Sequence, residues 1–306
     1  MTLSFTLLIL GGLLLYYGAE KIVHGGSHLA ARLGLSPLVI GLTIVAFGTS
    51  LPEMVVSLAA AAKDHSSIAI GNIIGSNIAN VGLVMGLSAF IFPLTITYLN
   101  IRKDLIIYMI AALVFTFFCF DGMINRWEGA ILFGGIIGYS WYSITRPRHR
   151  VEKDIYGKDS ITKCFFYLLF GSIFLYFGSK LFVEGAVSLA ELLGVSNVVI
   201  GMSVVALGTS LPELATSIVA SFHKEHGISV GNIIGSNLFN ILSVIGLVSF
   251  LYPLHVPLEI MQFEIPFMIA FGVVLFPIAL MKQPISKITS GILLIGYIAF
   301  IILLFN

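Results

Sequence analysis

The fold is decided by a stretch that occurs twice, as Gly41-Leu-Thr-Ile-Val-Ala-Phe-Gly-Thr-Ser-Leu-Pro-Glu53 and as Gly201-Met-Ser-Val-Val-Ala-Leu-Gly-Thr-Ser-Leu-Pro-Glu213. Both copies lie within apolar runs that are long enough to cross a membrane as a helix. A proline has no backbone N–H, and its ring crowds the carbonyl four residues earlier, so each helix must kink or open just before its glutamate. Each copy therefore predicts a broken membrane helix with a carboxylate beside the break.

A second motif repeats at the same distance. Gly71-Asn-Ile-Ile-Gly-Ser-Asn-Ile-Ala-Asn80 returns as Gly231-Asn-Ile-Ile-Gly-Ser-Asn-Leu-Phe-Asn240, and both motifs give one offset (213 − 53 = 160 and 240 − 80 = 160). A constant offset indicates a duplication without net insertion between the motifs. We therefore expect a first repeat over residues 1–145, a basic linker over 146–160 and a second repeat over 161–306.

The composition indicates an all-α membrane protein. The chain has 306 residues, of which 58% are hydrophobic and only 10% charged, whereas an ordinary soluble domain has about 25% charged residues. The formal net charge of +1 gives no reason to expect a nucleic-acid partner. Ten spanning helices are expected, with cores near Leu3–Val23, Pro37–Ala61, Ile68–Phe92, Asp104–Phe120, Gly129–Ile144, Cys164–Val183, Asn197–Phe222, Ile228–Leu251, Phe263–Met281 and Ile288–Leu304.

Five of these helices precede the linker, so the second repeat starts on the opposite side of the membrane and the two repeats are inverted. If the N-terminus is outside, thirteen of the sixteen Lys and Arg residues are cytoplasmic, as the positive-inside rule requires. We therefore expect a multi-pass protein of the cell membrane, with both termini outside and the linker in the cytoplasm. We also expect it to function as a monomer in the lipid bilayer. The three outer residues are Lys63, Arg126 and Lys180.

The repeated proline motif carries the candidate site. On a helix, Ala46, Thr49, Ser50 and Glu53 fall at i, i+3, i+4 and i+7, which is one face. A carboxylate at the bilayer centre costs about 2.5–3.5 kcal/mol, so a mirrored pair indicates function, although a protonated glutamate bonded between helices is the alternative. Hard cations such as Na⁺ and Ca²⁺ bind oxygen ligands of this kind. The equivalent residues of the second copy are Ala206, Thr209, Ser210 and Glu213.

The second motif adds a polar stripe to another helix. Residues at i, i+4 and i+8 share a face, and the Gly-x-x-x-Gly spacing beside them lets a neighbouring helix approach closely. Asn77 and Asn237 lie off this face, and we interpret them as packing or capping residues. The stripes consist of Asn72, Ser76 and Asn80 in the first copy and of Asn232, Ser236 and Asn240 in the second.

The chain carries no motif of catalysis or of a resident cofactor. It lacks a Gly-x-Ser-x-Gly elbow, a phosphate-binding lysine loop and a His-Glu-x-x-His pair. Its seven histidines fall near helix ends or in loops, with no spacing that indicates a zinc site. We therefore expect a protein that is not an enzyme and has no cofactor.

These paired motifs resemble the cation/calcium antiporter superfamily, specifically the sodium/calcium exchanger branch of compact prokaryotic type, over essentially the whole chain. The resemblance implies ten helices, with helices two, three, seven and eight around the ions and helices one and six sliding across them. It implies that Glu53 and Glu213 coordinate Ca²⁺ with the carbonyls of Thr49 and Thr209. For Na⁺ it implies the same glutamates, lined by Asn80 and Asn240, with the carbonyls of Ala46 and Ala206 and the side chains of Ser50, Ser76, Ser210 and Ser236.

This sequence departs from the family pattern at one place. Many relatives have aspartate at one of the two positions held here by Asn80 and Asn240. The two glutamates still balance one Ca²⁺, so we expect an antiporter that exchanges Na⁺ for Ca²⁺ by alternating access. The number of Na⁺ ions and a role for H⁺ or K⁺ are left open by the asparagines. The alternatives are an antiporter of Ca²⁺ and H⁺ and, from another class, a cation channel.

Overall fold

The computed structural model describes residues 1–95, 98–146, 159–193, 206–281 and 284–304. This part of the chain is helical apart from two short strands, β1 (Met123–Ile124) and β2 (Leu254–His255). The strands pair in antiparallel register, with Met123 opposite His255 and Ile124 opposite Leu254. The predicted all-α class is confirmed, and the strand pair, which joins loops of the two halves, is an addition that the sequence did not indicate.

The first half is built from α1 (Thr2–Leu33), α2 (Pro37–Ile40), the π-helical turn η1 (Gly41–Val45), α3 (Ala46–Thr49), α4 (Leu51–Ala61), α5 (Ser66–Ala79), the π-helical turn η2 (Asn80–Met85), α6 (Gly86–Ile91), α7 (Tyr98–Phe118) and α8 (Arg126–Thr145). The second half contains α9 (Ile161–Leu192), α11 (Ala206–Gly208), α12 (Leu211–Phe222), α13 (His226–Leu238), the π-helical turn η4 (Phe239–Ile245), α14 (Gly246–Leu251), the π-helical turn η5 (Ile260–Glu264), α15 (Ile265–Leu280) and α16 (Lys287–Leu304).

Within the described residues, six helices are long and apolar enough to cross a membrane, or seven if the bent segment from α2 to α4 counts as one span. The helices α7 and α8 correspond to the fourth and fifth predicted spanning helices, but they are not among these six. The seventh predicted span begins within residues 194–205, which lie outside the described ranges. The six spans are Thr2–Leu33, Ser66–Ile91, Ile161–Leu192, His226–Leu251, Ile260–Leu280 and Lys287–Leu304.

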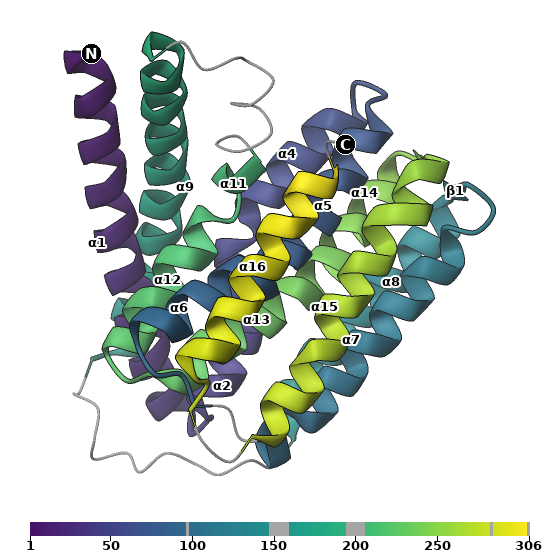
Figure 1. Cartoon of the computed structure of the whole chain (residues 1–306). Helices are drawn as coiled ribbons and strands as arrows, with labels where there is room; N and C mark the ends of the chain where they lie inside the picture. The colour runs from purple at the N-terminus through teal and green to yellow at the C-terminus, as the bar shows by residue number, and fades with distance from the viewer. Residues whose placement is uncertain (96–97, 147–158, 194–205, 282–283, 305–306) are drawn as a thin grey trace.

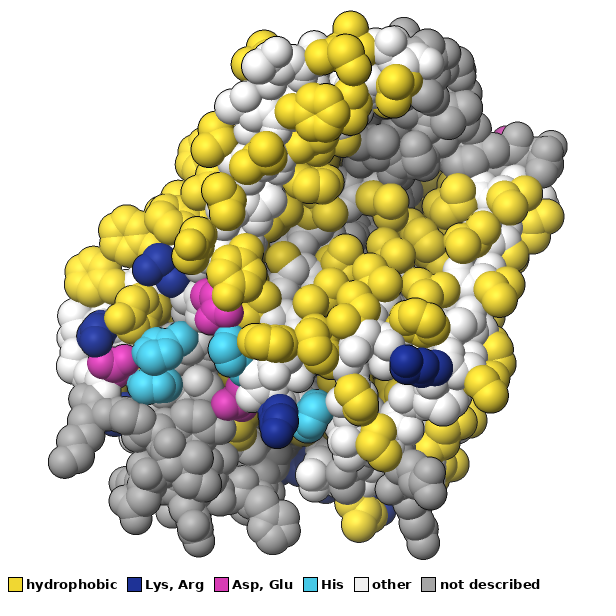
Figure 2. Space-filling model, turned by 60° about the vertical axis from the view of Figure 1, so that its left-hand side comes forward, with side chains coloured by type: hydrophobic (Ala, Val, Ile, Leu, Met, Phe, Trp, Pro, Cys, Tyr) yellow, Lys and Arg dark blue, Asp and Glu magenta, His cyan; other side chains and the backbone are white. Residues whose placement is uncertain are grey.

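The outer surface is strongly apolar, as Figure 2 shows for one face of the molecule. Along α1, the side chains of Phe5, Ile9 and Leu13 are exposed, and Phe165 and Leu169 are exposed on α9. A soluble monomer rarely exposes a continuous apolar surface of this extent, so the surface fits helices that are apolar enough to cross a membrane. Most of the charged and histidine side chains on this face lie in the lower half of Figure 2.

The two longest helices, α1 and α9, lie side by side at one flank of the molecule (Figure 1). A Cβ on Gly11 would lie 2.5 Å from the backbone nitrogen of Phe182, and one on Gly18 would lie 2.9 Å from that of Leu175. The contact positions fall along α9 as they rise along α1, so the helices are antiparallel. Glycine is required at both crossings because any side chain would collide with backbone.

The buried centre is formed by the segments α5–η2 and α13–η4, against which the shorter helices pack. A Cβ on Gly231 would lie 2.7 Å from the Leu38 carbonyl oxygen, so α13 approaches α2 closely, as its Gly-x-x-x-Gly spacing predicts. A Cβ on Gly71 meets no atom of the described residues within 4 Å. Its equivalent partner, residue 198, is outside the described ranges.

The predicted helix break is confirmed in the first repeat. The segments Pro37–Thr49 and Leu51–Ala61 meet at a bend of 44°, and Ser50 between them has φ −84° and ψ 6°. Pro52 lies in the first turn of the new helix, where a missing N–H costs no hydrogen bond. The same geometry precedes α12, because Ser210 has φ −85° and ψ 1° and Pro212 follows it.

Candidate cation-binding site

Glu53 and Glu213 both lie in the interior, and each has an exposed fraction of 0%. They occupy the first turns of α4 and α12, directly after the two helix breaks. The hydroxyl of Ser50 donates to Glu213 Oε1 over 3.3 Å, and the hydroxyl of Ser76 donates to Glu53 Oε1 over 3.4 Å. Since Ser50 stands three residues before Glu53, the motif of one repeat contacts the carboxylate of the other, and neither glutamate faces lipid.

Hydroxyl and amide groups connect the two motifs around these carboxylates. Thr49 Oγ1 donates to Asn232 Oδ1 over 2.9 Å and lies 3.3 Å from Ser236 Oγ. In the mirrored contacts, Thr209 Oγ1 donates to Asn72 Oδ1 over 3.3 Å and lies 3.4 Å from Ser76 Oγ. The structure thus brings together the proline motif of each repeat and the asparagine motif of the other.

Four asparagines cross-link the repeats at the centre of the molecule. Asn80 Nδ2 donates to Asn237 Oδ1, and Asn240 Nδ2 donates to Asn77 Oδ1, each over 3.0 Å. Asn77 and Asn237 also donate to each other's backbone carbonyl, over 3.4 and 3.3 Å. Asn80 and Asn240 lie in the π-helical turns η2 and η4, a distortion that is common at functional sites.

Five buried oxygen atoms of predicted site residues have no hydrogen-bond partner among the described residues. A buried polar atom without a partner costs about 1–3 kcal/mol, and more if it is charged. Oxygen atoms in such a cluster are the ligands that hard cations prefer, so an ion would satisfy what the protein leaves unbonded. The five atoms are Glu53 Oε2, Glu213 Oε2, Asn80 Oδ1, Asn240 Oδ1 and Ser210 Oγ.

The backbone carbonyl of Ala46, one of the expected Na⁺ ligands, is hydrogen-bonded in this structure. The Ala46 carbonyl accepts hydrogen bonds from the Ser50 N–H over 3.0 Å and from Thr49 Oγ1 over 3.2 Å, so the helix break does not free it. A proline removes the bond to the carbonyl four residues earlier, which for Pro52 is the carbonyl of residue 48. In the second repeat, Ala206 begins α11 and Thr209 follows that helix.

The sequence analysis missed the positioning roles of several repeated residues. Asn72 Nδ2 donates to the Glu53 carbonyl over 3.4 Å and to Ser57 Oγ over 3.1 Å. Asn232 makes the same two contacts with Glu213 and Ser217, over 3.3 and 3.1 Å. Ser57 recurs as Ser217 at the offset of 160, and this recurrence is the sequence signal that indicates their shared role. The earlier interpretation of Asn77 and Asn237 as packing residues also misses their crossed hydrogen bonds.

Comparison with known proteins shows which family the chain belongs to. The family described as "Sodium/calcium exchanger protein" matches the chain over residues 3–145 and 163–306, which is nearly its whole length. The chain belongs to this family. Exchanger-family membership and the apolar helices together identify a multi-pass membrane protein.

The relatives of this exchanger-family chain cover most or all of its length. It is 33% identical to the sodium/calcium exchanger MaX1 of Methanosarcina acetivorans over 100% of this chain and 99% of that protein. It is 32% identical to the inner membrane protein YrbG of Escherichia coli over 83% of this chain and 81% of that protein. A solved structure of the sodium-calcium exchanger NCX_Mj matches with a TM-score of 0.85 and 32% identity, over 98% of each chain.

Proposed function

We propose that this chain is a secondary antiporter that exchanges Na⁺ for Ca²⁺ across the cell membrane by alternating access. The single observation that carries the proposal is the pair of fully buried carboxylates: Glu213 accepts a hydrogen bond from Ser50, Glu53 accepts one from Ser76, and each keeps an oxygen without a partner among the described residues. A buried negative pair at membrane depth is stable only with a compensating positive charge. The transported ion supplies that charge.

The charge balance explains why the two ions exchange. Two carboxylates neutralise one Ca²⁺, and they also attract Na⁺, so both ions need the same two groups. Neither ion can occupy the site fully while the other is bound. When the site is empty and doubly charged, the change between the outward- and inward-facing states has a high free-energy barrier. The carrier therefore returns only after it binds the second ion, and this couples the transport of the two ions.

The proposed ligands are those that the resemblance to the exchanger family implies. Ca²⁺ is bound by the carboxylates of Glu53 and Glu213 together with the carbonyls of Thr49 and Thr209. The amide oxygens of Asn80 and Asn240, which have no partner among the described residues, face the middle of the site and support either ion. Na⁺ uses the glutamates with Ser50, Ser76, Ser210, Ser236 and the carbonyls of Ala46 and Ala206.

Two observations support ten helices arranged as two inverted repeats, over residues 1–145 and 161–306. The helices α1 and α9 are equivalent at the offset of 160, yet they run antiparallel, as an inversion requires. The crossed bonds of Asn77 and Asn237 likewise map onto each other when the repeats are exchanged. In this proposal the protein is a monomer with both termini outside and the linker 146–160 in the cytoplasm, and both termini lie in the upper half of Figure 1.

The same packing supports alternating access by a sliding helix pair. A Cβ on Gly48, within the first broken helix, would lie 2.6 Å from Ser172 Oγ of α9. Ser179 of α9 donates to the carbonyl of Gly208, at the second break. The helix α9 therefore crosses both breaks, so a shift of the α1–α9 pair changes access to both glutamates.

The proposal is tested in proteoliposomes that contain only this protein. An outward Na⁺ gradient should drive uptake of ⁴⁵Ca²⁺, and an outward K⁺ gradient of equal size should not. Uptake that ignores Na⁺ and follows a proton gradient would identify a Ca²⁺/H⁺ antiporter instead. Uptake that needs no counter-ion and does not saturate would identify a channel.

A further inference from the structure

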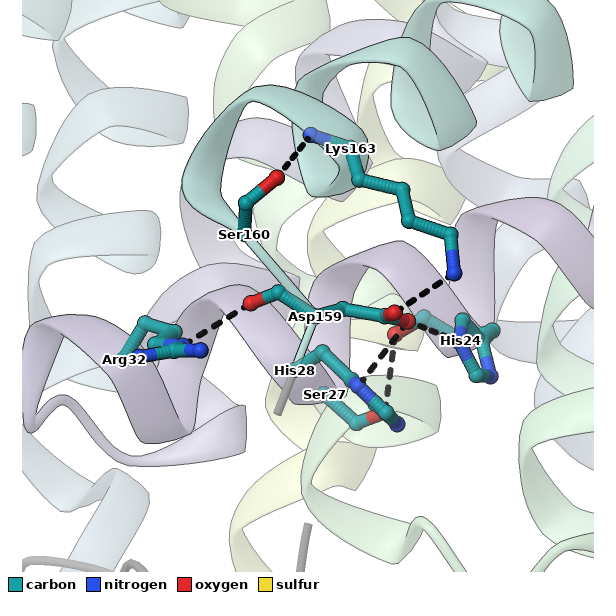
Figure 3. Close-up of polar contacts among 7 residues, drawn as sticks. All are labelled: His24, Ser27, His28, Arg32, Asp159, Ser160 and Lys163. Carbon is teal, nitrogen blue, oxygen red and sulfur yellow. Dashed lines mark hydrogen bonds and ion pairs between the residues drawn. The ribbon is translucent and has the colours of Figure 1, made fainter. Parts of the chain in front are cut away.

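Two histidines and an aspartate converge where the α1–α9 pair meets the linker, outside the central site (Figure 3). His24 Nε2 lies 2.9 Å from Asp159 Oδ2, and His28 Nδ1 lies 3.4 Å from the same oxygen. Ligand atoms of the three residues all lie within 4.8 Å of one another. Within the ranges that the structure describes, this is the one group of three such side chains with that geometry.

Both helices hold these side chains in place. His24 and His28 are four residues apart on α1 and share a face, with their rings stacked at 4.0 Å between centroids. Asp159 directly precedes Ser160, which caps the first turn of α9. Arg32 Nε donates to the Asp159 carbonyl over 2.8 Å and fixes its backbone against α1. The three ligand-type groups are therefore assembled by the fold and are drawn together in Figure 3.

We infer that this cluster binds a divalent ion of the zinc class, such as Zn²⁺, Co²⁺ or Ni²⁺. Two imidazoles and one carboxylate form a donor set that these ions prefer, whereas Ca²⁺ prefers oxygen ligands alone. In a tetrahedral shell with bonds of about 2.0–2.1 Å, ligand atoms lie about 3.3 Å apart. The observed separations of 2.9 and 3.4 Å lie on either side of that value. Water takes the fourth position.

The neighbouring charge sets the mode of binding. Lys163 Nζ lies 2.6 Å from Asp159 Oδ1, so this oxygen is engaged and only Oδ2 is offered to the metal. The ammonium also repels a bound cation, so its removal should strengthen metal binding. His24 has a side chain that is 45% exposed, which gives the ion a route from solution. A bound ion would fasten the residues that enter α9 to α1, so that the pair moves as one body.

The rival interpretation is that Asp159 only forms ion pairs that hold the linker on α1. The cluster was not predicted from the sequence, because the carboxylate that joins the histidine pair follows His24 by 135 residues. Ion pairing alone predicts no affinity for a transition metal, and it predicts that loss of Lys163 weakens the cluster. The two interpretations therefore differ in whether the unaltered chain binds a transition metal at all, and only the metal site predicts that loss of Lys163 strengthens such binding.

The test uses the full chain, purified in detergent without a polyhistidine tag and kept in excess Ca²⁺ so that the central site is occupied. Co²⁺ is titrated by calorimetry, and the visible spectrum of bound Co²⁺ is recorded. We expect one Co²⁺ per chain with imidazole ligands. His24→Ala, His28→Ala and Asp159→Asn should each weaken binding at least about tenfold, because even outer-shell changes at metal sites cost about 10–100-fold. Lys163→Met should strengthen it.

The matched control is His255→Ala, which removes an exposed histidine in β2 and should leave Co²⁺ binding unchanged. Absence of saturable Co²⁺ binding to the unaltered chain would overturn the inference. Binding that persists at full strength in the three ligand variants would also overturn it. Because binding is measured in excess Ca²⁺ and without transport, the result does not depend on whether the chain exchanges Na⁺.

Discussion

Replacing Glu213 by glutamine tests the charge balance of the central site. Glutamine has the shape of glutamate and can still accept the hydrogen bond from Ser50, so the packing is preserved. The site with Ca²⁺ bound then keeps one uncompensated positive charge at membrane depth. Such a charge costs about 2.5–3.5 kcal/mol, which corresponds to a loss of about 70- to 400-fold in Ca²⁺ affinity. Glu53→Gln should lose as much, because the two glutamates hold mirrored positions.

The assay is ⁴⁵Ca²⁺ uptake into proteoliposomes under a fixed outward Na⁺ gradient, with the Ca²⁺ concentration varied to obtain the half-saturating value. At concentrations that half-saturate the unaltered protein, both variants should show essentially no Na⁺-driven uptake. Glu259→Gln is the matched control, since it removes an exposed carboxylate outside the polar cluster. Thermal melting in detergent establishes that each variant is folded. A folded Glu53 or Glu213 variant whose half-saturating Ca²⁺ stays within about threefold of the original would refute the charge argument.

Two further predictions concern the centre and the flank of the molecule. Asn240→Asp replaces the amide that donates to Asn77 Oδ1 by a carboxylate, so that two acceptors face each other and attract a cation or proton. When ⁴⁵Ca²⁺ uptake is measured over a series of Na⁺ and of K⁺ concentrations, its dependence on the monovalent ion should change while Ca²⁺ binding is kept. An unchanged dependence on both ions would contradict the prediction. Gly11→Val pushes a side chain into the Phe182 backbone, and it should lower the melting temperature in detergent by the equivalent of about 1–3 kcal/mol. Gly12→Val, which meets open space, should not, and equal shifts in both variants would refute the close crossing.

Much of the fold could be predicted because a membrane restricts the options. The apolar runs located the helices that the structure describes, and Pro52 located the break in the first repeat to within a few residues. The residues at which helices end could be predicted less well. The first helix was expected to have its core at Leu3–Val23, whereas α1 continues to Leu33. Its last turns are more polar, and they remain helical because they pack against neighbouring helices, which hydropathy alone does not detect.

The burial of Glu53 and Glu213 in the interior could be predicted, because a carboxylate in the middle of an apolar segment has few structural explanations. The roles of Asn77 and Asn237 could not, since helical periodicity places them off the polar face. The crossed bonds arise only when two helices that are distant in the sequence, α5 and α13, meet in the interior. The hydrogen bonds to the Ala46 carbonyl could not be predicted from the sequence either, because they depend on which donors lie near it at the break.

The asparagines at 80 and 240 explain how a site with only two negative charges remains ordered. Each amide donates an N–H to the opposite repeat, at Asn237 or Asn77, and its buried oxygen has no hydrogen-bond partner among the described residues. An aspartate in either place would add a charge and remove that brace, because a carboxylate cannot donate. The present arrangement therefore fixes the repeats to each other through neutral groups and leaves the charge to the glutamates. In the proposed site the two glutamates match the charge of one Ca²⁺, and we expect any additional Na⁺ ions to be held by neutral oxygens.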